Sequence, residues 1–314
     1  MNRSQSREAS LPARPGAICR RDFLVSGVKA SLCFIACDAF ASAAEPGKPG
    51  HLGHATRNID DSLHIIADYL TLYTPPAGNF PASGSWKATY DILQRATRRK
   101  AAYGHMVVTR RPVAGGITYD TDFHNRLFDF GSSLKSTMRC SADPLPRLVE
   151  WTTDYEVYLQ PDPPPEWMQE FNGSIPPLSS VPPTSMRERG THKDGVLEIS
   201  TSLNSRKIQT DRPVAPQWAV LDALRNAKAD SSAPIANLDF DLFHNLTSYR
   251  PHQRLRPSGV LDITMGNLPP QTFHGFYQTG IGSEPTNYWI DSQGRPLFMT
   301  EGLISAALTN IEPA

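Results

Sequence analysis

The sequence LVEWTTDYEVYL, at residues 148–159, decides the fold of this chain. Positions 149, 151, 153, 155 and 157 carry Val, Trp, Thr, Tyr and Val, whereas positions 150, 152, 154 and 156 carry Glu, Thr, Asp and Glu. Side chains of a β-strand point alternately to the two faces of a sheet, so this period of two predicts a strand with one buried and one solvated face.

Segments of similar character follow one another on both sides of this stretch and predict an antiparallel β-rich fold. Turn signals separate several of them, at Gly115-Gly116, at Asp194-Gly195 and at Asp291 to Gly294. The expected strands are 86–97, 103–111, 116–130, 134–140, 196–203, 207–210, 238–249, 260–264, 273–279, 287–290, 296–300 and 303–309.

Two segments instead have helical character. Residues 58–73 place Leu63, Ile66, Leu70 and Tyr73 on one helical face, and two prolines follow the segment. Residues 216–228 begin with proline, which is favoured in the first turn of a helix, and carry apolar residues at helical spacing.

The N-terminal segment, residues 1–44, has the features of a twin-arginine export signal. Arg20 and Arg21 precede a short apolar run at residues 25–37, and Ala41-Ser42-Ala43 offers a small-residue cleavage site. This predicts a protein that folds first, contacts the twin-arginine translocase during export and acts in the periplasm or beyond. An alternative is lipidation of Cys37, because residues 34–37 loosely match a lipoprotein signal.

Charge and cysteine content restrict the class of partner. The chain has 31 basic and 31 acidic residues, and removal of residues 1–44 leaves 25 basic and 28 acidic ones. This balance argues against nucleic acid as a partner, because nucleic-acid binding requires clustered basic charge. Cys140 is the only cysteine beyond the leader, so we expect it to be a small buried apolar residue. No cofactor motif is present, and we predict no cofactor.

The chain divides into five sections. After the leader come a tether at 45–57, a helix with a first β section at 58–160, a proline-rich loop at 161–189 and a second β section at 190–314 in the same domain. Residues 161–183 contain eight prolines, which exclude a regular helix or a central strand. The loop is either an ordered flap that docks through Trp167, Met168 and Phe171, or a linker between two lobes.

One predicted strand carries candidate catalytic residues. Asp120, Asp122 and His124 are spaced by two and therefore share one face of a strand. Two carboxylates and an imidazole could hold a divalent metal that activates water, although the metal itself is unknown. The competing interpretation is a solvated strand face whose charges are balanced by Arg126.

Aromatic residues are the candidate ligand-binding groups. On a curved sheet they could line an apolar trough, or they could simply pack in the core. The candidates are Trp151, Tyr155, Trp218, Phe243, Tyr249, Phe276 and Tyr288.

The C-terminal half resembles a known group of proteins. The motifs are APQWAVLDALR at residues 215–225 and YWIDSQGRPL at 288–297, separated by further strands. Over roughly residues 190–310 the chain resembles uncharacterised exported bacterial proteins whose curved antiparallel half-barrel is similar to that of periplasmic lipoprotein carriers. The resemblance implies a fold and an apolar ligand, and it carries over no catalytic residue.

Together these observations predict a mainly β protein, a curved antiparallel sheet or half-barrel with two packed helices. The expected function is the binding of an apolar small molecule or lipid at the bacterial envelope, without catalysis. The alternatives are a periplasmic metal-dependent or acid–base hydrolase that uses Asp120, Asp122 and His124, and an accessory subunit of an envelope complex.

Overall fold

Strand β5 (Leu148–Leu159) has the bounds that the alternation of its residues predicts. The computed structural model describes residues 63, 66–81, 84–94, 102–127, 130–159, 184–225, 237–244, 249–302 and 304–314. In these residues fifteen strands form one sheet with two helices, so the predicted mainly β class is confirmed. The leader with Cys37, the tether, and residues 160–183 lie outside the described residues.

The first half of the sheet is an antiparallel meander in which each strand pairs with the next one along the chain. Its turns follow the predicted signals. Asp194 and Gly195 both have positive φ, 51° and 72°, as the two central residues of a tight hairpin turn require. The strands are β1 (Trp86–Gln94), β2 (Gly104–Val113), β3 (Gly116–Leu127), β4 (Phe130–Cys140), β5, β6 (Thr184–Lys193), β7 (Val196–Thr201) and β8 (Ser205–Gln209).

The second half runs back from the opposite end of the sheet until its last strand pairs with β1. Helix α5 (Gln217–Arg225) connects β9 (Val214–Pro216) to β10 (Leu238–Phe243), the one parallel pair among the described strands. The remaining strands are β11 (Tyr249–Ile263), β12 (Gln271–Thr279), β13 (Thr286–Asp291), β14 (Pro296–Glu301) and β15 (Ile304–Glu312).

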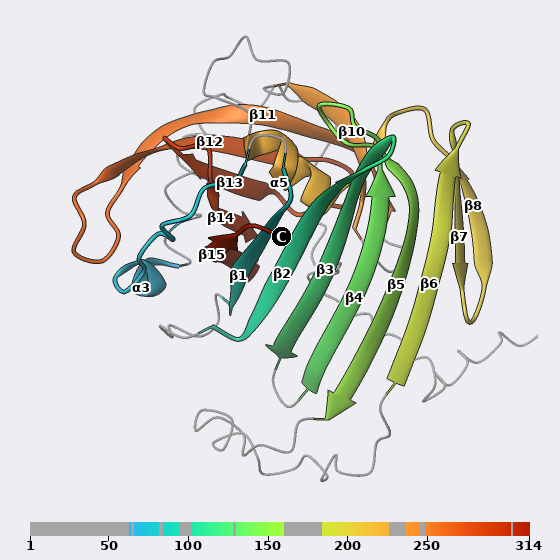
Figure 1. The fold of residues 1–314 in the computed structure, drawn as a ribbon, viewed down its shortest axis with the longest axis horizontal. Helices are drawn as coiled ribbons and strands as arrows, with labels where there is room; N and C mark the ends of the chain where they lie inside the picture. Colours follow the sequence, from blue (N-terminus) through green and yellow to red (C-terminus); the bar gives the residue numbers. More distant parts are fainter. Residues whose placement is uncertain are drawn as a thin grey trace, which may run out of the picture.

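The sheet curves around α5 as an open half-barrel (Figure 1). Strands β8 and β9 are its two edges. The curvature brings β10 back towards β5, where the rings of Trp151 and Phe243 lie 4.4 Å apart between their centroids. The predicted half-barrel with packed helices is therefore confirmed.

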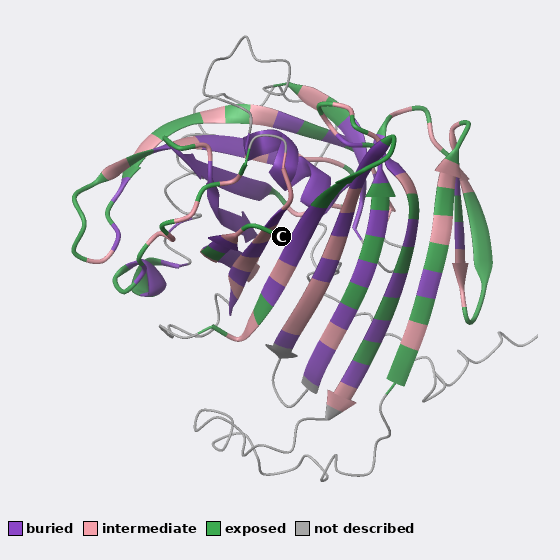
Figure 2. Ribbon diagram, viewed as in Figure 1, coloured by how far each residue is buried: buried purple, intermediate pink, exposed green. Residues whose placement is uncertain are grey.

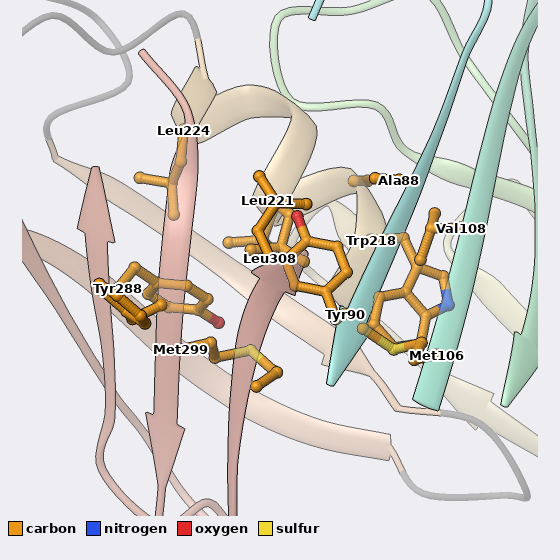
Figure 3. Packing of buried hydrophobic residues seen from close by; sticks show 14 of the residues in the cluster. Ala88, Tyr90, Met106, Val108, Trp218, Leu221, Leu224, Tyr288, Met299 and Leu308 are labelled. Carbon is orange, nitrogen blue, oxygen red and sulfur yellow. The ribbon is translucent and has the colours of Figure 1, made fainter. Parts of the chain in front are cut away.

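Helix α5 fills the concave side of the sheet, and all nine of its residues are buried. Trp218, Leu221 and Leu224 point towards the inner residues of the surrounding strands, among them Tyr90 and Met299 (Figure 3). Figure 2 shows this burial along α5, together with alternating burial along β4 and β5.

The convex side is covered in its central part by the segment around α3 (Ala67–Leu70). The Tyr73 ring lies 4.9 Å from that of Phe298 on β14, and the Tyr69 hydroxyl donates to Asp91 on β1 at 2.9 Å. Because both faces are covered here, every residue of β13 and β14 is buried. Of the predicted helix 58–73, the structure describes residues 63 and 66–73, and the helix α3 within them is four residues long; residues 58–62, 64 and 65 lie outside the described residues.

Two strands differ from the sequence-based expectation. Residues 184–189 belong to β6 rather than to the end of the proline-rich loop. Strand β11 starts at Tyr249 and passes through Pro251 and Pro257, although prolines usually exclude an inner strand. The sheet accommodates Pro257 at a register shift between Pro257 and Gly259, where a regular ladder hydrogen bond is not required.

Among the helices of the described residues, none is both long and apolar enough to span a membrane.

Candidate ligand-binding face

A second, smaller apolar cluster lies on four strands of the first meander. Leu134, Tyr155 and Val157 form its buried part, and Phe123 and Met186 pack against it. We refer to these five residues as the concave stripe. Phe123 on β3 lies opposite Leu134 on β4, which lies opposite Tyr155 on β5 and then Met186 on β6. With strands about 4.8 Å apart, this row spans about 14 Å across the sheet.

The concave stripe faces the same side as α5. The Tyr119 hydroxyl on β3 donates to Asp222 of α5 at 2.7 Å, so Tyr119 points inward. Residues two and four positions further along a strand share its face, which places Thr121 and Phe123 on the concave side. The cross-strand register then carries Leu134, Tyr155 and Met186 to the same side.

The concave stripe extends beyond the part of the sheet that α5 covers. In the same row of the sheet, Tyr90 and Met106 on β1 and β2 belong to the main core. Among the described residues, the members of the smaller cluster all come from strands β3 to β6. Leu134 and Tyr155 are each 4% exposed and Val157 is 9% exposed, so this apolar surface is shielded from solvent.

Polar residues flank the concave stripe on both sides. One neighbouring row runs from Thr121 through Ser136 and Thr153 to Glu188, and all four residues are buried. The Thr153 hydroxyl donates to Ser136 at 3.2 Å. Asn125 and Ser132 are buried on the other side of the stripe, beside Val157. The face thus combines a narrow apolar band with hydroxyl, amide and carboxylate groups, a composition suited to an amphipathic molecule.

Trp151 and Glu188 connect this face to the main core. The indole N–H of Trp151 donates to a carboxylate oxygen of Glu188 at 2.8 Å, and the same ring packs on Phe243. Trp151 belongs to the main core and is held by both contacts, so it marks the point where the core around α5 meets the concave face.

The seven predicted ligand-binding aromatics occupy four environments. Trp218, Phe276 and Tyr288 are buried in the main core, where α5 packs on the sheet. Trp151 and Phe243 form the boundary pair. Tyr249 donates its hydroxyl to the buried Asp241 at 2.5 Å, and burial raises its pKa above the ordinary range, with hydrogen bonding to Asp241 adding to the shift. Tyr155 is the one member of the predicted set in the concave stripe.

The side chains of the predicted catalytic residues lie on the opposite, convex face of the sheet. Asp120, Asp122 and His124 share one side of β3, as the spacing predicts. However, Asp120 pairs with Arg111 and accepts a hydrogen bond from Thr137 at 2.6 Å, whereas Asp122 contacts His124. Within the described residues, no group of three or more His, Cys, Asp or Glu side chains is arranged to hold a metal ion. Arg126 lies on β3, and its side chain lies outside the described residues.

A buried charge network ties α5 to the sheet. Asp222 accepts hydrogen bonds from Arg110 on β2 and Tyr119 on β3, both at 2.7 Å. Nε of Arg225 lies 2.9 Å from the other carboxylate oxygen, which makes an ion pair without hydrogen-bond geometry. Burial lowers the pKa of Arg225, and Asp222 opposes that shift. Cys140 is buried beside this network, and burial raises its pKa, as expected for an inert thiol.

A second group of buried ionisable residues lies between β10, β11 and β14. Arg250 donates to Glu301 at 2.8 Å, and both side chains are 9% exposed. Burial raises the pKa of Glu301, and Arg250 opposes this shift. Burial lowers the pKa of His244 well below 6.5, and the positive charge of Arg250 lowers it further. These groups are buried among the residues of the core.

Comparison of the chain with family models, with curated proteins and with solved structures yields no match. The class of protein is therefore described from the fold and the concave face alone. It is a mainly β protein with an open, curved antiparallel sheet and an amphipathic inner surface.

Sequence reasoning missed Phe123, Leu134, Val157 and Met186 as members of the candidate site. The alternation along 148–159 does place Val157 on the face of Tyr155. The other three residues could be recognised only from the cross-strand register, which depends on pairing between separate strands.

Proposed function

We propose that the protein binds an apolar or amphipathic small molecule on the concave stripe, without catalysing a reaction on it. The supporting observation is the apolar cluster of Phe123, Leu134, Tyr155, Val157 and Met186, which faces the inside of an open half-barrel and meets the main core at Phe123. If this end of the sheet were simply exposed to solvent, we would expect polar residues in the row from Phe123 to Met186.

The energetics of such a surface favour an apolar partner. Removing apolar surface from water contributes about 25 cal/mol per Å², and a ligand on the stripe makes this gain through its own apolar surface. Leu134, Tyr155 and Val157 are already shielded from solvent. Binding would therefore replace their present contacts with contacts to the ligand. The neighbouring hydroxyl groups and Glu188 supply polar contacts for a head group.

The predicted export signal indicates the compartment in which the protein would bind its ligand. Residues 20–43 support delivery of a folded protein to the periplasm, with lipidation at Cys37 as the alternative to cleavage after Ala43. The mass of the exported protein distinguishes the two outcomes, because lipidation adds acyl chains and leaves Cys37 as the first residue.

The binding test uses two neighbouring positions on β4 that point to opposite faces. Leu134→Gln places an amide in the concave stripe, whereas Lys135→Gln places the same amide on the convex face. Native mass spectrometry of the gently purified protein detects a ligand that copurifies. Titration with the amphipathic dye anilinonaphthalene sulfonate, which joins apolar aromatic rings to a sulfonate, then measures affinity in both variants.

We expect Leu134→Gln to weaken dye binding at least about tenfold, which corresponds to about 1.4 kcal/mol, and Lys135→Gln to bind like the unchanged protein. Urea unfolding of both variants confirms that they are folded. Equal dye affinity in the two folded variants would refute the assignment of the site to the concave stripe.

A further inference from the structure

Strand β8 forms one edge of the sheet, on the side away from α5 (Figure 1). In the part of the chain that the structure describes, no strand lies beyond it. Four of its five residues are exposed and Ile208 is half-buried, and Figure 2 shows this exposure along the strand. The outer edge of β8 can therefore be reached from solvent.

The pairing of β8 with β7 determines which of its backbone groups point outward. The Thr210 N–H, just after β8, donates to the Gly195 carbonyl at 2.8 Å. In an antiparallel pair, residues that bond to the neighbouring strand alternate with residues that bond away from it, so every second residue back from Thr210 bonds to β7. The residues whose N–H and C=O groups point to the outer edge are Ser205, Lys207 and Gln209.

Hydrogen bonds hold both ends of this edge in place. In the turn before β8, the Thr201 N–H donates to the Asn204 carbonyl at 2.8 Å. After β8, the Thr210 hydroxyl donates to the Gly195 carbonyl at 3.1 Å and lies 2.9 Å from Nε2 of His192. A strand that is already ordered loses little conformational entropy when a partner pairs with it.

We propose that the outer edge of β8 binds an extended acidic segment of another protein, which adds to the sheet as a further strand. In this mode of recognition the main-chain hydrogen bonds supply affinity and the side chains supply specificity. Strand β8 carries Arg206 and Lys207 and no acidic residue. Lys207 pairs with Glu198 on β7, and their side chains are 71% and 50% exposed. Such an exposed pair contributes little, so Lys207 can turn to a carboxylate of the partner.

The charges around β8 also favour an acidic partner. Across residues 189–212, which include β7 and β8, five basic residues outnumber three acidic ones. The basic residues are Arg189, Lys193, Arg206, Lys207 and Arg212, and the acidic ones are Asp194, Glu198 and Asp211.

A second copy of this chain is a poorer partner for the same edge. If two β8 strands paired antiparallel with the longest overlap, Lys207 would lie opposite Lys207 of the second copy and Arg206 opposite Ile208. Like charges directly opposite one another on paired strands are destabilising. An acidic residue opposite Lys207 instead makes a favourable cross-strand pair.

Fluorescence polarisation with a fluorescein-labelled peptide tests the proposal on the purified protein. The acidic peptide Gly-Ser-Thr-Val-Glu-Glu-Thr-Ser-Gly places its valine opposite Ile208 and its glutamates opposite Lys207 and Arg206 when it pairs antiparallel. In the matched basic peptide two lysines replace the glutamates. We expect the acidic peptide to bind, and the basic peptide to bind at least about fivefold more weakly because of like charges.

Two variants at one position separate the backbone from the charge. Lys207→Pro removes an outward N–H but no hydrogen bond to β7, since proline is tolerated on an edge strand where its nitrogen faces solvent. We expect it to weaken binding of the acidic peptide at least about tenfold, because the added strand loses a ladder hydrogen bond and meets the proline ring. Lys207→Gln keeps the N–H and should weaken binding only about twofold to threefold. Circular dichroism verifies the fold of both variants.

A modified peptide tests the backbone pairing without any change to the protein. Methylation of the backbone nitrogens of its five central residues keeps the charges but removes the N–H donors, so this peptide should not bind. The proposal is overturned if the acidic peptide fails to bind, or if the basic or the methylated peptide binds equally well. Equal binding by folded Lys207→Pro would also overturn it. A dimer of the unchanged protein in sedimentation equilibrium that Lys207→Pro abolishes would assign the edge to a second copy instead.

Discussion

At the scale of single residues, His244 shows how burial makes stability depend on pH. It follows the end of β10, is 2% exposed and lies near Arg250. Both burial and the nearby positive charge favour the neutral imidazole, so its pKa in the folded protein is well below 6.5.

We predict that the free energy of unfolding decreases as the pH falls from 7.5 to 5. In this window the unfolded chain protonates His244 near pH 6.5, whereas the folded protein does so only at lower pH. The unfolded state therefore binds more protons, and stability is lost on acidification. Burial also lowers the pKa of His192, which adds to this loss, while the raised pKa of Glu301 acts in the opposite direction.

Urea unfolding from pH 5 to pH 7.5 tests the assignment to His244. His244→Gln should flatten the dependence on pH, whereas the convex-face variant His124→Gln should retain it. An unchanged pH dependence in His244→Gln would show that other groups cause the loss.

For single residues, the sequence predicted which face of the sheet a side chain occupies, but not which residue that side chain contacts. The spacing correctly placed Asp120, Asp122 and His124 on one side of β3. It could not show that Arg111 engages Asp120, because that contact depends on the pairing of β2 with β3. The same dependence on pairing hid the contact between His105 and His124.

At the scale of elements, α5 is held in the half-barrel by charge as well as by apolar packing. Arg110 and Tyr119 approach Asp222 from two adjacent strands, and Arg225 approaches it from the helix itself. The carboxylate therefore compensates two guanidinium groups that are each only 7% exposed.

We predict that Asp222→Asn destabilises the protein by about 3–5 kcal/mol, because it leaves two buried cations without their counter-charge. The measurement is equilibrium unfolding in urea, followed by circular dichroism. Asp120→Asn is the matched control, since it breaks a partly exposed pair with Arg111 and should cost no more than about 1 kcal/mol. Comparable losses in the two variants would mean that the buried network does not anchor α5.

The accuracy of the element predictions follows the strength of the local signal. Strand β5 has strict alternation, and α5 has apolar residues at helical spacing after a proline, so both were predicted near their observed bounds. Strand β6, TSMRERGTHK, lacks an apolar face, and β11 contains two prolines, so neither was recognised along its length. Pairing with neighbouring strands stabilises both despite their weak local propensity.

At the scale of the whole molecule, the sheet consists of two meanders joined by one distant pairing. Nearly all neighbouring strands are also neighbours in sequence, which local turn signals can predict. The exception is β1 with β15, whose register extends from Lys87–Glu312 to Gln94–Ile304. Nothing in the local sequence specifies this pairing, yet it brings the concave stripe on β3 to β6 into one continuous surface with the core around α5.

This pairing makes the last strand essential for the entire fold. A chain that ends at Gly302 lacks β15, so β1 and β14 become unpaired edges and the Tyr73 hydroxyl loses its acceptor, the Leu308 carbonyl. We expect this variant to lose the cooperative thermal transition in far-UV circular dichroism, because the core on both faces of the sheet extends across the pairing of β1 with β15. Removal of only Pro313 and Ala314 should preserve the transition, since both follow β15. If the chain that ends at Gly302 instead unfolds cooperatively at the same temperature as the unchanged protein, each meander folds on its own.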